Sequence, residues 1–250
     1  MKTSFYPLFI LLLILAFSKS AHSQAAIDLE TGAVFTGYND VRIPGDAGTF
    51  FSLKDDLNPE TAFFYRLRLS YTLNARHTLS LLYAPLEVKS EGSVPEDIFF
   101  TGVEFPAHTE LDASFKFNSY RITYRYEIVR KPGLEFGLGF TAKLRDAKIA
   151  LSSPGLSAEK PNVGFVPIIN FRLFWKLYEN LGLLLYGDAL AAPQGRAEDV
   201  LLAATLDLSE RFRIRAGYRI LEGGADNDEV YTFSLFNYAS VGITYMLITE

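Results

Sequence analysis

The 250-residue sequence predicts an all-β protein: an antiparallel, up-and-down transmembrane β-barrel of about ten strands, with eight or twelve strands as alternatives. Three observations support this fold. Apolar residues take every second position over long stretches, the connections between these stretches alternate in length, and charged residues fill the intervening positions. In 63–73, FFYRLRLSYTL, one parity is entirely apolar and the other carries Arg66 and Arg68.

The first 23 residues have the form of a secretory signal peptide. Lys2 is followed by an apolar run over 7–17 and by the small-x-small site Ala21-His22-Ser23. The apolar run is too short to cross a bilayer as a helix. We expect residues 1–23 to direct export, and residues 24–250 to form one barrel domain, because no linker rich in Pro, Gly or Ser divides them.

The composition excludes several classes of protein. The chain is 49% hydrophobic, which excludes a disordered segment, and it has no cysteine, so something other than disulfides must close the fold. Without residues 1–23 it keeps 24 − 2 = 22 Lys and Arg against 29 Asp and Glu, a net charge of −7. We expect no nucleic-acid binding, since that binding needs basic patches. The three histidines lack metal-ligand spacing, so we expect no metal and no cofactor.

The expected strands follow one another along the chain, each with its own alternation. Their ranges are 27–39, 61–73, 77–90, 111–129, 133–151, 163–177, 181–192, 199–209, 211–222 and 230–247. From the third strand onward, the apolar positions of one parity are Leu79, Leu81, Tyr83, Ile122, Tyr124, Tyr126, Ile128, Leu134, Phe136, Leu138, Phe140, Ile169, Phe171, Leu173, Trp175, Leu181, Leu183, Leu185, Leu202, Leu206, Leu208, Phe212, Ile214, Tyr218, Val241, Ile243, Tyr245 and Leu247. Pro85 and Pro167 fall inside strands, where each removes a ladder donor, and we expect a bulge at Pro85.

The connections alternate between short and long. Short turns occupy 74–76, 130–133, 179–180 and 209–210, and long connections occupy 40–60, 90–110, 153–162, 193–199 and 223–229. This predicts that all turns lie at one end of the barrel and all long loops at the other. The segment 98–105, IFFTGVEF, is more apolar than a loop, and it is either an extension of the outer hairpin above the membrane or an additional strand.

The two parities differ in a way that assigns the faces. The bulky apolar groups exceed what one barrel interior holds, so we expect them to face lipid. An Arg or Lys facing lipid near mid-bilayer would cost about 2–4 kcal/mol, which directs the charged parity inward. The predicted lumen-lining residues are Arg66, Arg68, Arg121, Arg125, Glu135, Lys143, Arg145, Arg172, Lys176, Asp188, Asp207, Arg213, Arg215 and Arg219.

Aromatic residues on the apolar face fall near the two ends of the strands. Such residues form belts at the two lipid–water boundaries of a membrane barrel. The predicted periplasmic belt comprises Tyr71, Tyr126, Trp175 and Tyr245, and the predicted outer belt comprises Tyr65, Tyr83, Phe140 and Tyr218.

With this strand pattern, residues 24–250 resemble bacterial outer-membrane β-barrels as a class. The resemblance implies a location in the outer membrane of a Gram-negative cell after export, with membrane lipid and the barrel-assembly machinery as partners. Barrels of this class usually end on an aromatic residue that the machinery reads. This chain alternates through Tyr245 and Leu247 but ends at Glu250, which departs from that pattern.

The function expected from these features is non-enzymatic and porin-like. An Arg-rich lumen favours anions, by the field that such a lining creates. Ten strands enclose a narrow space, so the charged residues also suit an internal ion-pair network that plugs it. We therefore expect either restricted passage of small anions or presentation of loops 40–60 and 91–110 at the surface. The identity of a small-molecule ligand stays open.

Two other functions fit parts of the sequence. Omptin-like proteases resemble this chain in using ten strands, with an Asp pair opposite a His-Asp pair at the outer rim. That resemblance implies an outer-membrane hydrolase with Asp55, Asp56, His108 and Asp112 as its rim residues. The third alternative is a soluble periplasmic barrel that binds an apolar ligand within its interior.

Overall fold

The computed structural model describes residues 23–192 and 195–248, and no helix in those residues is long and apolar enough to cross a bilayer. Residues 1–22 of the expected signal peptide, and Glu250, lie outside the described residues. The strands are β1 (Ser23–Arg42), β2 (Phe51–Ser52), β3 (Asn58–Pro59), β4 (Ala62–Leu73), β5 (His77–Ala84), β6 (Glu87–Ser93), β7 (Ile98–Phe100), β8 (Val103–Phe105), β9 (Glu110–Lys131), β10 (Leu134–Ser153), β11 (Leu156–Lys176), β12 (Leu181–Ala192), β13 (Gly195–Asp207), β14 (Phe212–Asp226) and β15 (Tyr231–Ile248).

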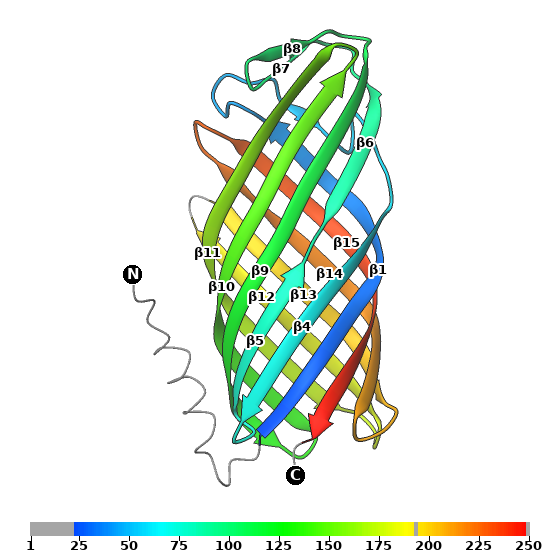
Figure 1. The fold of residues 1–250 in the computed structure, drawn as a ribbon, viewed down its shortest axis with the longest axis vertical. Helices are drawn as coiled ribbons and strands as arrows, with labels where there is room; N and C mark the ends of the chain where they lie inside the picture. Colours follow the sequence, from blue (N-terminus) through cyan, green and yellow to red (C-terminus); the bar gives the residue numbers. More distant parts are fainter. Residues whose placement is uncertain (1–22, 193–194, 249–250) are drawn as a thin grey trace, which may run out of the picture.

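Ten of the described strands close an antiparallel barrel (Figure 1). Round the wall the order is β1, β4, β5, β9, β10, β11, β12, β13, β14 and β15, and β15 pairs with β1 to complete the ring. Each strand lies beside the barrel strand that follows it along the chain. The predicted all-β, up-and-down barrel of ten strands is confirmed.

β6 continues β5 along the same edge of β9. Ala84 pairs with Ser119 and Glu87 with Lys116, so the register against β9 is unchanged across Pro85 and Leu86. On the other side, Asn58 of β3 pairs with Glu91, one residue out of the register that Leu67 and Tyr83 set between β4 and β5. The bulge expected at Pro85 is therefore absent from the β9 ladder, and the offset lies on the β3–β4 side.

Several strands extend beyond their predicted ends. β11 begins at Leu156, so most of 153–162, expected as a loop, is strand that pairs with β10. β13 begins at Gly195 and β1 continues to Arg42. A strand needs only about 9–11 residues to cross the hydrocarbon, whereas β9, β10 and β11 have 22, 20 and 21. The barrel must therefore project well beyond the membrane.

The short turns and the described chain ends lie at one end of the barrel, and the long connections lie at the other (Figure 1). β1 starts and β15 finishes at the lower end of the view, beside the turns that follow β4, β9, β11 and β13. The β7–β8 hairpin lies at the opposite end. This distribution is the one that the connection lengths predicted.

Half-way along β9, the apolar residues move from the outward positions to the inward positions. In 120–128 the outward residues are apolar and exposed, and the inward residues are polar, from Ser119 to Glu127. In 110–118 the outward residues are polar, from Glu110 to Asn118, and the inward ones are Leu111, Ala113, Phe115 and Phe117. We call the part of the barrel with apolar outward residues the membrane zone, and the part beyond it the outer zone.

β10 shows the same inversion, after Leu144. Leu138, Phe140 and Leu144 are exposed on the outside, whereas Ile149 and Leu151 are buried inside. Asp146 and Lys148 take outward positions in the outer zone, where Lys116 donates a 3.0 Å hydrogen bond to Asp146 and lowers the pKa of that carboxyl. The outer zone is thus built like a water-soluble barrel, with an apolar interior and a polar exterior.

An apolar cluster closes the outer mouth. The two long connections that follow β1 and β6 fold over the mouth and contribute Ile43, Leu53, Leu57 and Val94 to the cluster. The segment 98–105 forms the β7–β8 hairpin, a separate two-stranded sheet, and so is not an eleventh strand of the wall. Its side chains Ile98, Phe100 and Phe105 are 2%, 0% and 0% exposed.

Candidate functional site: the sealed interior of the barrel

The centre of the membrane zone holds a layer of ion pairs around Asp199. Its carboxylate accepts hydrogen bonds from Nη2 of Arg66 at 2.8 Å and from Nη2 of Arg121 at 2.5 Å. Arg219 donates to the other carboxylate oxygen. These partners come from β4, β9 and β14, so Asp199 ties together strands from separate parts of the wall.

Glu30 and Asp188 are two further carboxylates of this layer, and Asp28, which pairs with Arg215, is the fourth. Glu30 on β1 accepts hydrogen bonds of 2.8 Å from Nε and Nη2 of Arg219, and one of 3.0 Å from Arg215. Asp188 on β12 accepts hydrogen bonds from Arg121 at 2.6 Å, from Thr141 at 2.6 Å and from Asn170 at 2.9 Å.

The layer is balanced in charge. Its carboxylates are Asp28, Glu30, Asp188 and Asp199, and its guanidinium groups are Arg66, Arg121, Arg215 and Arg219, four of each. Buried charges lose their hydration and are stable only when paired and hydrogen-bonded. A balanced set meets that condition, so the layer can exist without a bound ion.

The layer separates two cavities. Neither cavity is lined by Arg66, Arg121, Asp188 or Asp199, and these four side chains are at most 5% exposed. The periplasmic cavity has a volume of about 330 Å³ and the outer cavity one of about 460 Å³. Buried ion pairs therefore separate these two cavities in the described residues.

The periplasmic cavity carries most of the remaining charged residues predicted from the sequence. Arg125 donates a 2.9 Å hydrogen bond to Glu127, and Arg172 donates one of 2.8 Å to Glu135. Arg68 stacks over Tyr186, with its guanidinium carbon 4.6 Å from the ring centroid. The lining contains seven arginines and four carboxylates: Arg68, Arg125, Arg130, Arg172, Arg213, Arg215 and Arg219 against Asp28, Glu30, Glu127 and Glu135. Two of these arginines, Arg213 and Arg219, also pair with Asp207 and Asp199, which lie outside the lining.

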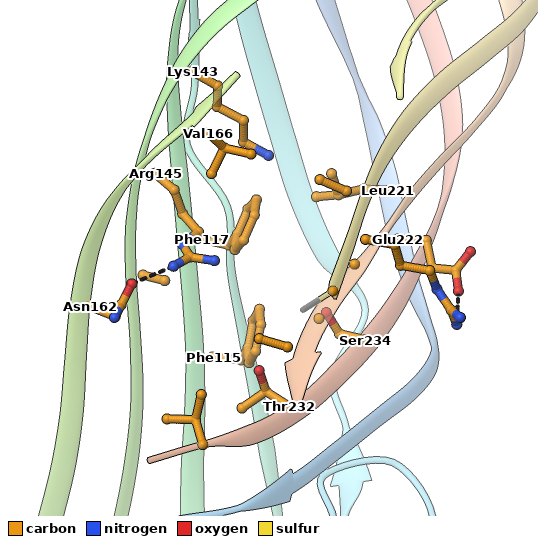
Figure 2. Close-up of a pocket in the computed structure, with 18 of the residues that line it drawn as sticks. Phe115, Phe117, Lys143, Arg145, Asn162, Val166, Leu221, Glu222, Thr232 and Ser234 are labelled. Carbon is orange, nitrogen blue, oxygen red and sulfur yellow. Dashed lines mark hydrogen bonds and ion pairs between the residues drawn. The ribbon is translucent and has the colours of Figure 1, made fainter. Parts of the chain in front are cut away.

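The outer cavity lies in the outer half of the barrel (Figure 2). Lys143 and Arg145 of β10 line it, together with Phe115 and Phe117 of β9 and Leu221 of β14. At its rim, Tyr38 donates a hydrogen bond to Glu222 and accepts one from Arg196. Partial burial and the hydrogen bond to Glu222 raise the pKa of the Tyr38 hydroxyl.

The predicted lumen residues thus fall into different parts of the molecule. Arg66, Arg121, Asp188, Arg215 and Arg219 belong to the layer, Lys143 and Arg145 line the outer cavity, and Arg68, Arg125, Glu135, Arg172 and Arg213 line the periplasmic cavity. Asp207 pairs with Arg213. Lys176 is exposed and lines a pocket beside the turn at 130–133.

Sequence reasoning missed Asp199 and the apolar outer interior. Asp199 is the last residue of an expected loop and the first of the expected strand 199–209, so it was not assigned to the lumen although it shares the parity of Asp207. The inward apolar run from Leu111 to Phe117 was a readable signal, because its parity is opposite to that of 120–128.

The predicted belt residues lie on the outward face. Tyr65 and Tyr83 pack edge to face with ring centroids 6.0 Å apart, and Tyr83 stacks on Tyr120 at 5.2 Å. Near the periplasmic end, Tyr126 lies 5.1 Å from His77, and Tyr245 lies 4.9 Å from Phe212. The remaining members are exposed or half-buried: Tyr71, Phe140, Trp175 and Tyr218.

The four rim residues of the hydrolase hypothesis are Asp55, Asp56, His108 and Asp112, and all are exposed. Asp56 accepts a 2.7 Å hydrogen bond from the amide of Ser52. Asp112 lines a pocket with Glu91 and Ser152 that includes none of the other three. In the described part of the chain, no hydrogen bond or ion pair joins any two of the four, and no group of His, Asp and Glu could hold a metal.

No family model and no curated protein sequence matches the chain. Solved structures do match the chain, among them the following three. The outer membrane protease OmpT from Escherichia coli has 10% sequence identity and a TM-score of 0.53, over 90% of this chain and 97% of that one. The transport unit of the autotransporter AIDA-I from Escherichia coli has 8% identity and a TM-score of 0.46, over 92% of each chain. Ail from Yersinia pestis has 12% identity and a TM-score of 0.40, over 89% of this chain and 99% of that one.

OmpT, the one of these three structures with a TM-score above 0.5, is an outer membrane protein. The chain therefore has the fold of a bacterial outer-membrane β-barrel, and the resemblance predicted from the sequence is confirmed. An outer-membrane location is consistent with this fold and with the exposed apolar band of the membrane zone.

Proposed function

We propose that the protein is a non-enzymatic outer-membrane β-barrel that is closed to solutes and acts at the cell surface through its outer zone and outer loops. The observation that carries this proposal is the ion-pair layer. Arg121 and Asp188 have side chains only 1% exposed, and they lie between two separate cavities. Solute passage would require these buried pairs to separate, and breaking one such pair costs about 3–5 kcal/mol.

The mouth supports the same proposal. The two long outer connections are held by an apolar cluster that includes Leu53, Phe100 and Phe105. Loops fixed in this way present a defined surface to the medium, whereas loops that serve only to join strands need no such core.

Conductance in planar bilayers tests the closed state. We expect no channel events from the wild type, whereas a barrel that lacks two side chains of the layer, Arg121→Ala with Asp188→Ala, is expected to conduct more often. The double variant keeps the net charge unchanged. Steady conductance of the wild type that prefers anions would overturn the proposal.

Restricted passage of small anions is the second candidate. The surplus of arginines over carboxylates in the lining of the periplasmic cavity favours it, because such a lining concentrates anions near one end of the barrel. The same recording separates the two candidates. Anion-selective wild-type conductance that falls in Arg125→Gln would support passage.

A non-enzymatic role is also tested at the rim. We expect no turnover of peptides or lipids by the purified barrel that depends on His108 or Asp112. Turnover that disappears in His108→Ala, with an unchanged thermal transition, would establish a hydrolase instead.

A further inference from the structure

The outer cavity differs from the periplasmic cavity in having cations without acidic partners. Lys143 is 3% exposed and its ammonium lies 4.7 Å from the ring centroid of Phe117 (Figure 2). In the described chain, Lys143 makes no hydrogen bond or ion pair with a carboxylate. Arg145, two residues along β10, donates to the amide oxygen of Asn162, and its Nε has no partner.

The charged residues that border the cavity from outward positions of their strands are paired. Lys148 donates to Glu159 at 3.0 Å, and Arg196 bonds Glu222 at 2.5 Å. On the inward parity, Lys143, Arg145 and Lys160 line the cavity. Glu222, the one carboxylate among the described residues that line it, lies at an outward position and is paired with Arg196. The interior of this cavity is therefore positively charged, in contrast to the balanced layer beneath it.

An unpaired cation inside a protein is costly, because burial removes its hydration. The ion-pair layer shows that this barrel pairs its other deeply buried cations, such as Arg66 and Arg219, with carboxylates. Lys143 is as deeply buried as these two. A negatively charged group from outside the chain would supply the partner that the chain itself does not.

The rest of the cavity is apolar. Phe115, Ile149, Leu221 and Phe236 are buried side chains that line it beyond the cations, and Val166 and Leu190 line its side. A volume of about 460 Å³ lies in the range of small-molecule sites. Each CH₂ group transferred from water to such a wall contributes about 0.8 kcal/mol, so an alkyl chain fits this lining.

The cavity is bounded on one side by the low rim of the β12–β13 hairpin. β11 pairs with β12 only as far as Ile169 and Ala189, so 156–168 of β11 has a free edge on that side. Phe165 and Pro167 of this edge line the cavity together with Ala192 and Gly195 at the ends of the hairpin.

This rim coincides with the outer limit of the membrane zone. On β13 the outward residues change from Leu202 and Val200 to Glu198 and Arg196 as the hairpin rises. Val163 and Phe165, outward residues on the free edge of β11, are each 66% exposed. A molecule held in the outer leaflet would therefore meet the opening at the level of the lipid headgroups.

We propose that the outer cavity binds a single-chain amphiphile with an anionic carboxylate or phosphate head, which meets Lys143 and Arg145 while its alkyl chain lies along Phe115, Leu221 and Phe236. The molecule enters over the β12–β13 rim. This site is independent of the closed state of the barrel, because the ion-pair layer lies below it.

The test measures displacement of 11-(dansylamino)undecanoate from the full-length barrel in phosphatidylcholine nanodiscs, with empty nanodiscs as background. The competitors are dodecanoate, dodecyl phosphate, dodecanol and acetate. We expect dodecanoate and dodecyl phosphate to displace the probe at concentrations at least tenfold below dodecanol, and acetate to fail. Equal displacement by dodecanol and by both anions would overturn the proposal that the site recognises an anionic head group. If only dodecyl phosphate competes, the site takes phosphate heads.

Variants locate the site. Lys143→Gln and Arg145→Gln should each weaken dodecanoate binding about tenfold or more and leave dodecanol unchanged. Lys116→Gln is the matched control, because it removes the same charge from an outward position of the neighbouring strand β9 that does not line the cavity, and it should bind as the wild type does. Val166→Trp should abolish binding of both dodecanoate and dodecanol by filling the cavity while leaving both cations in place. Equal losses in Lys116→Gln and Lys143→Gln, or full binding by Val166→Trp, would overturn the assignment.

Discussion

Asp199 of β13 and Arg121 of β9 meet inside the barrel at 2.5 Å, although 78 residues separate them in the sequence. Three strands lie between β9 and β13 along the shorter path round the wall, so the contact crosses the lumen. This ion pair links two strands of the wall that share no hydrogen-bond ladder.

Replacement of Asp199 by Asn should destabilise the barrel strongly. The change leaves Arg66, Arg121 and Arg219 without their shared carboxylate, and an uncompensated buried charge costs about 3–5 kcal/mol. Urea unfolding in lipid vesicles measures the free energy of unfolding. Asp207→Asn is the control, since its pair with Arg213 is partly exposed and should contribute less than about 1 kcal/mol. Similar losses in both variants would contradict a special role for the layer.

The cost of placing a charge on the outside of the barrel should differ between the membrane zone and the outer zone. Leu138→Arg puts a guanidinium on the exposed apolar face of β10, where it should lower the free energy of unfolding by about 2–4 kcal/mol. Ser157→Arg on β11 lies at an exposed outward position of the outer zone and should change it by less than about 0.5 kcal/mol. Equal losses in the free energy of unfolding in lipid vesicles would show that the two positions face the same surroundings.

The β7–β8 hairpin allows a matched test of the apolar cluster. Phe100 is fully buried and its neighbour Phe99 is 38% exposed. Phe100→Ala should cost about 3–5 kcal/mol and speed protease cleavage within 94–109, because the hairpin loses its anchor over the mouth. Phe99→Ala should cleave at nearly the wild-type rate. Slow cleavage in both variants would show that other contacts hold the hairpin.

Gly139 should tolerate no larger residue. A Cβ at this position of β10 would lie 2.0 Å from the carbonyl oxygen of Tyr124, so Gly139→Ala forces the β9–β10 ladder apart. We expect a lower yield of heat-resistant folded barrel on gel electrophoresis. Gly155 at the β10–β11 turn has φ of +81° and open space around it, so Gly155→Asn should fold normally, since Asn adopts this conformation readily. Normal folding of Gly139→Ala would contradict the close approach.

The sequence was sufficient to predict the barrel because a period of two appears in every strand and survives errors in the strand ends. That period puts Arg66 and Leu67 on opposite faces, and the cost of a charge in lipid directs Arg66 inward and Leu67 outward. The partner of each charge could not be predicted, because Asp199 and Arg121 meet across the lumen and no local rule relates β13 to β9. The two zones were missed for a different reason: the inside and outside positions of β9 alternate without a break, but the apolar residues change from one parity to the other, so that Phe117 and Tyr120 lie on opposite faces.

The reversal of faces along β9 and β10 also constrains how the protein enters its membrane. The finished outer zone carries Asp112, Lys116 and Glu159 on its surface, and a preformed cylinder with that coat could not slide through hydrocarbon. The strand tips must cross first, while the barrel is still open. The apolar interior of the outer zone can assemble only after these tips reach the aqueous far side. Membrane insertion therefore has a fixed order, in which the apolar cluster over the outer mouth forms last.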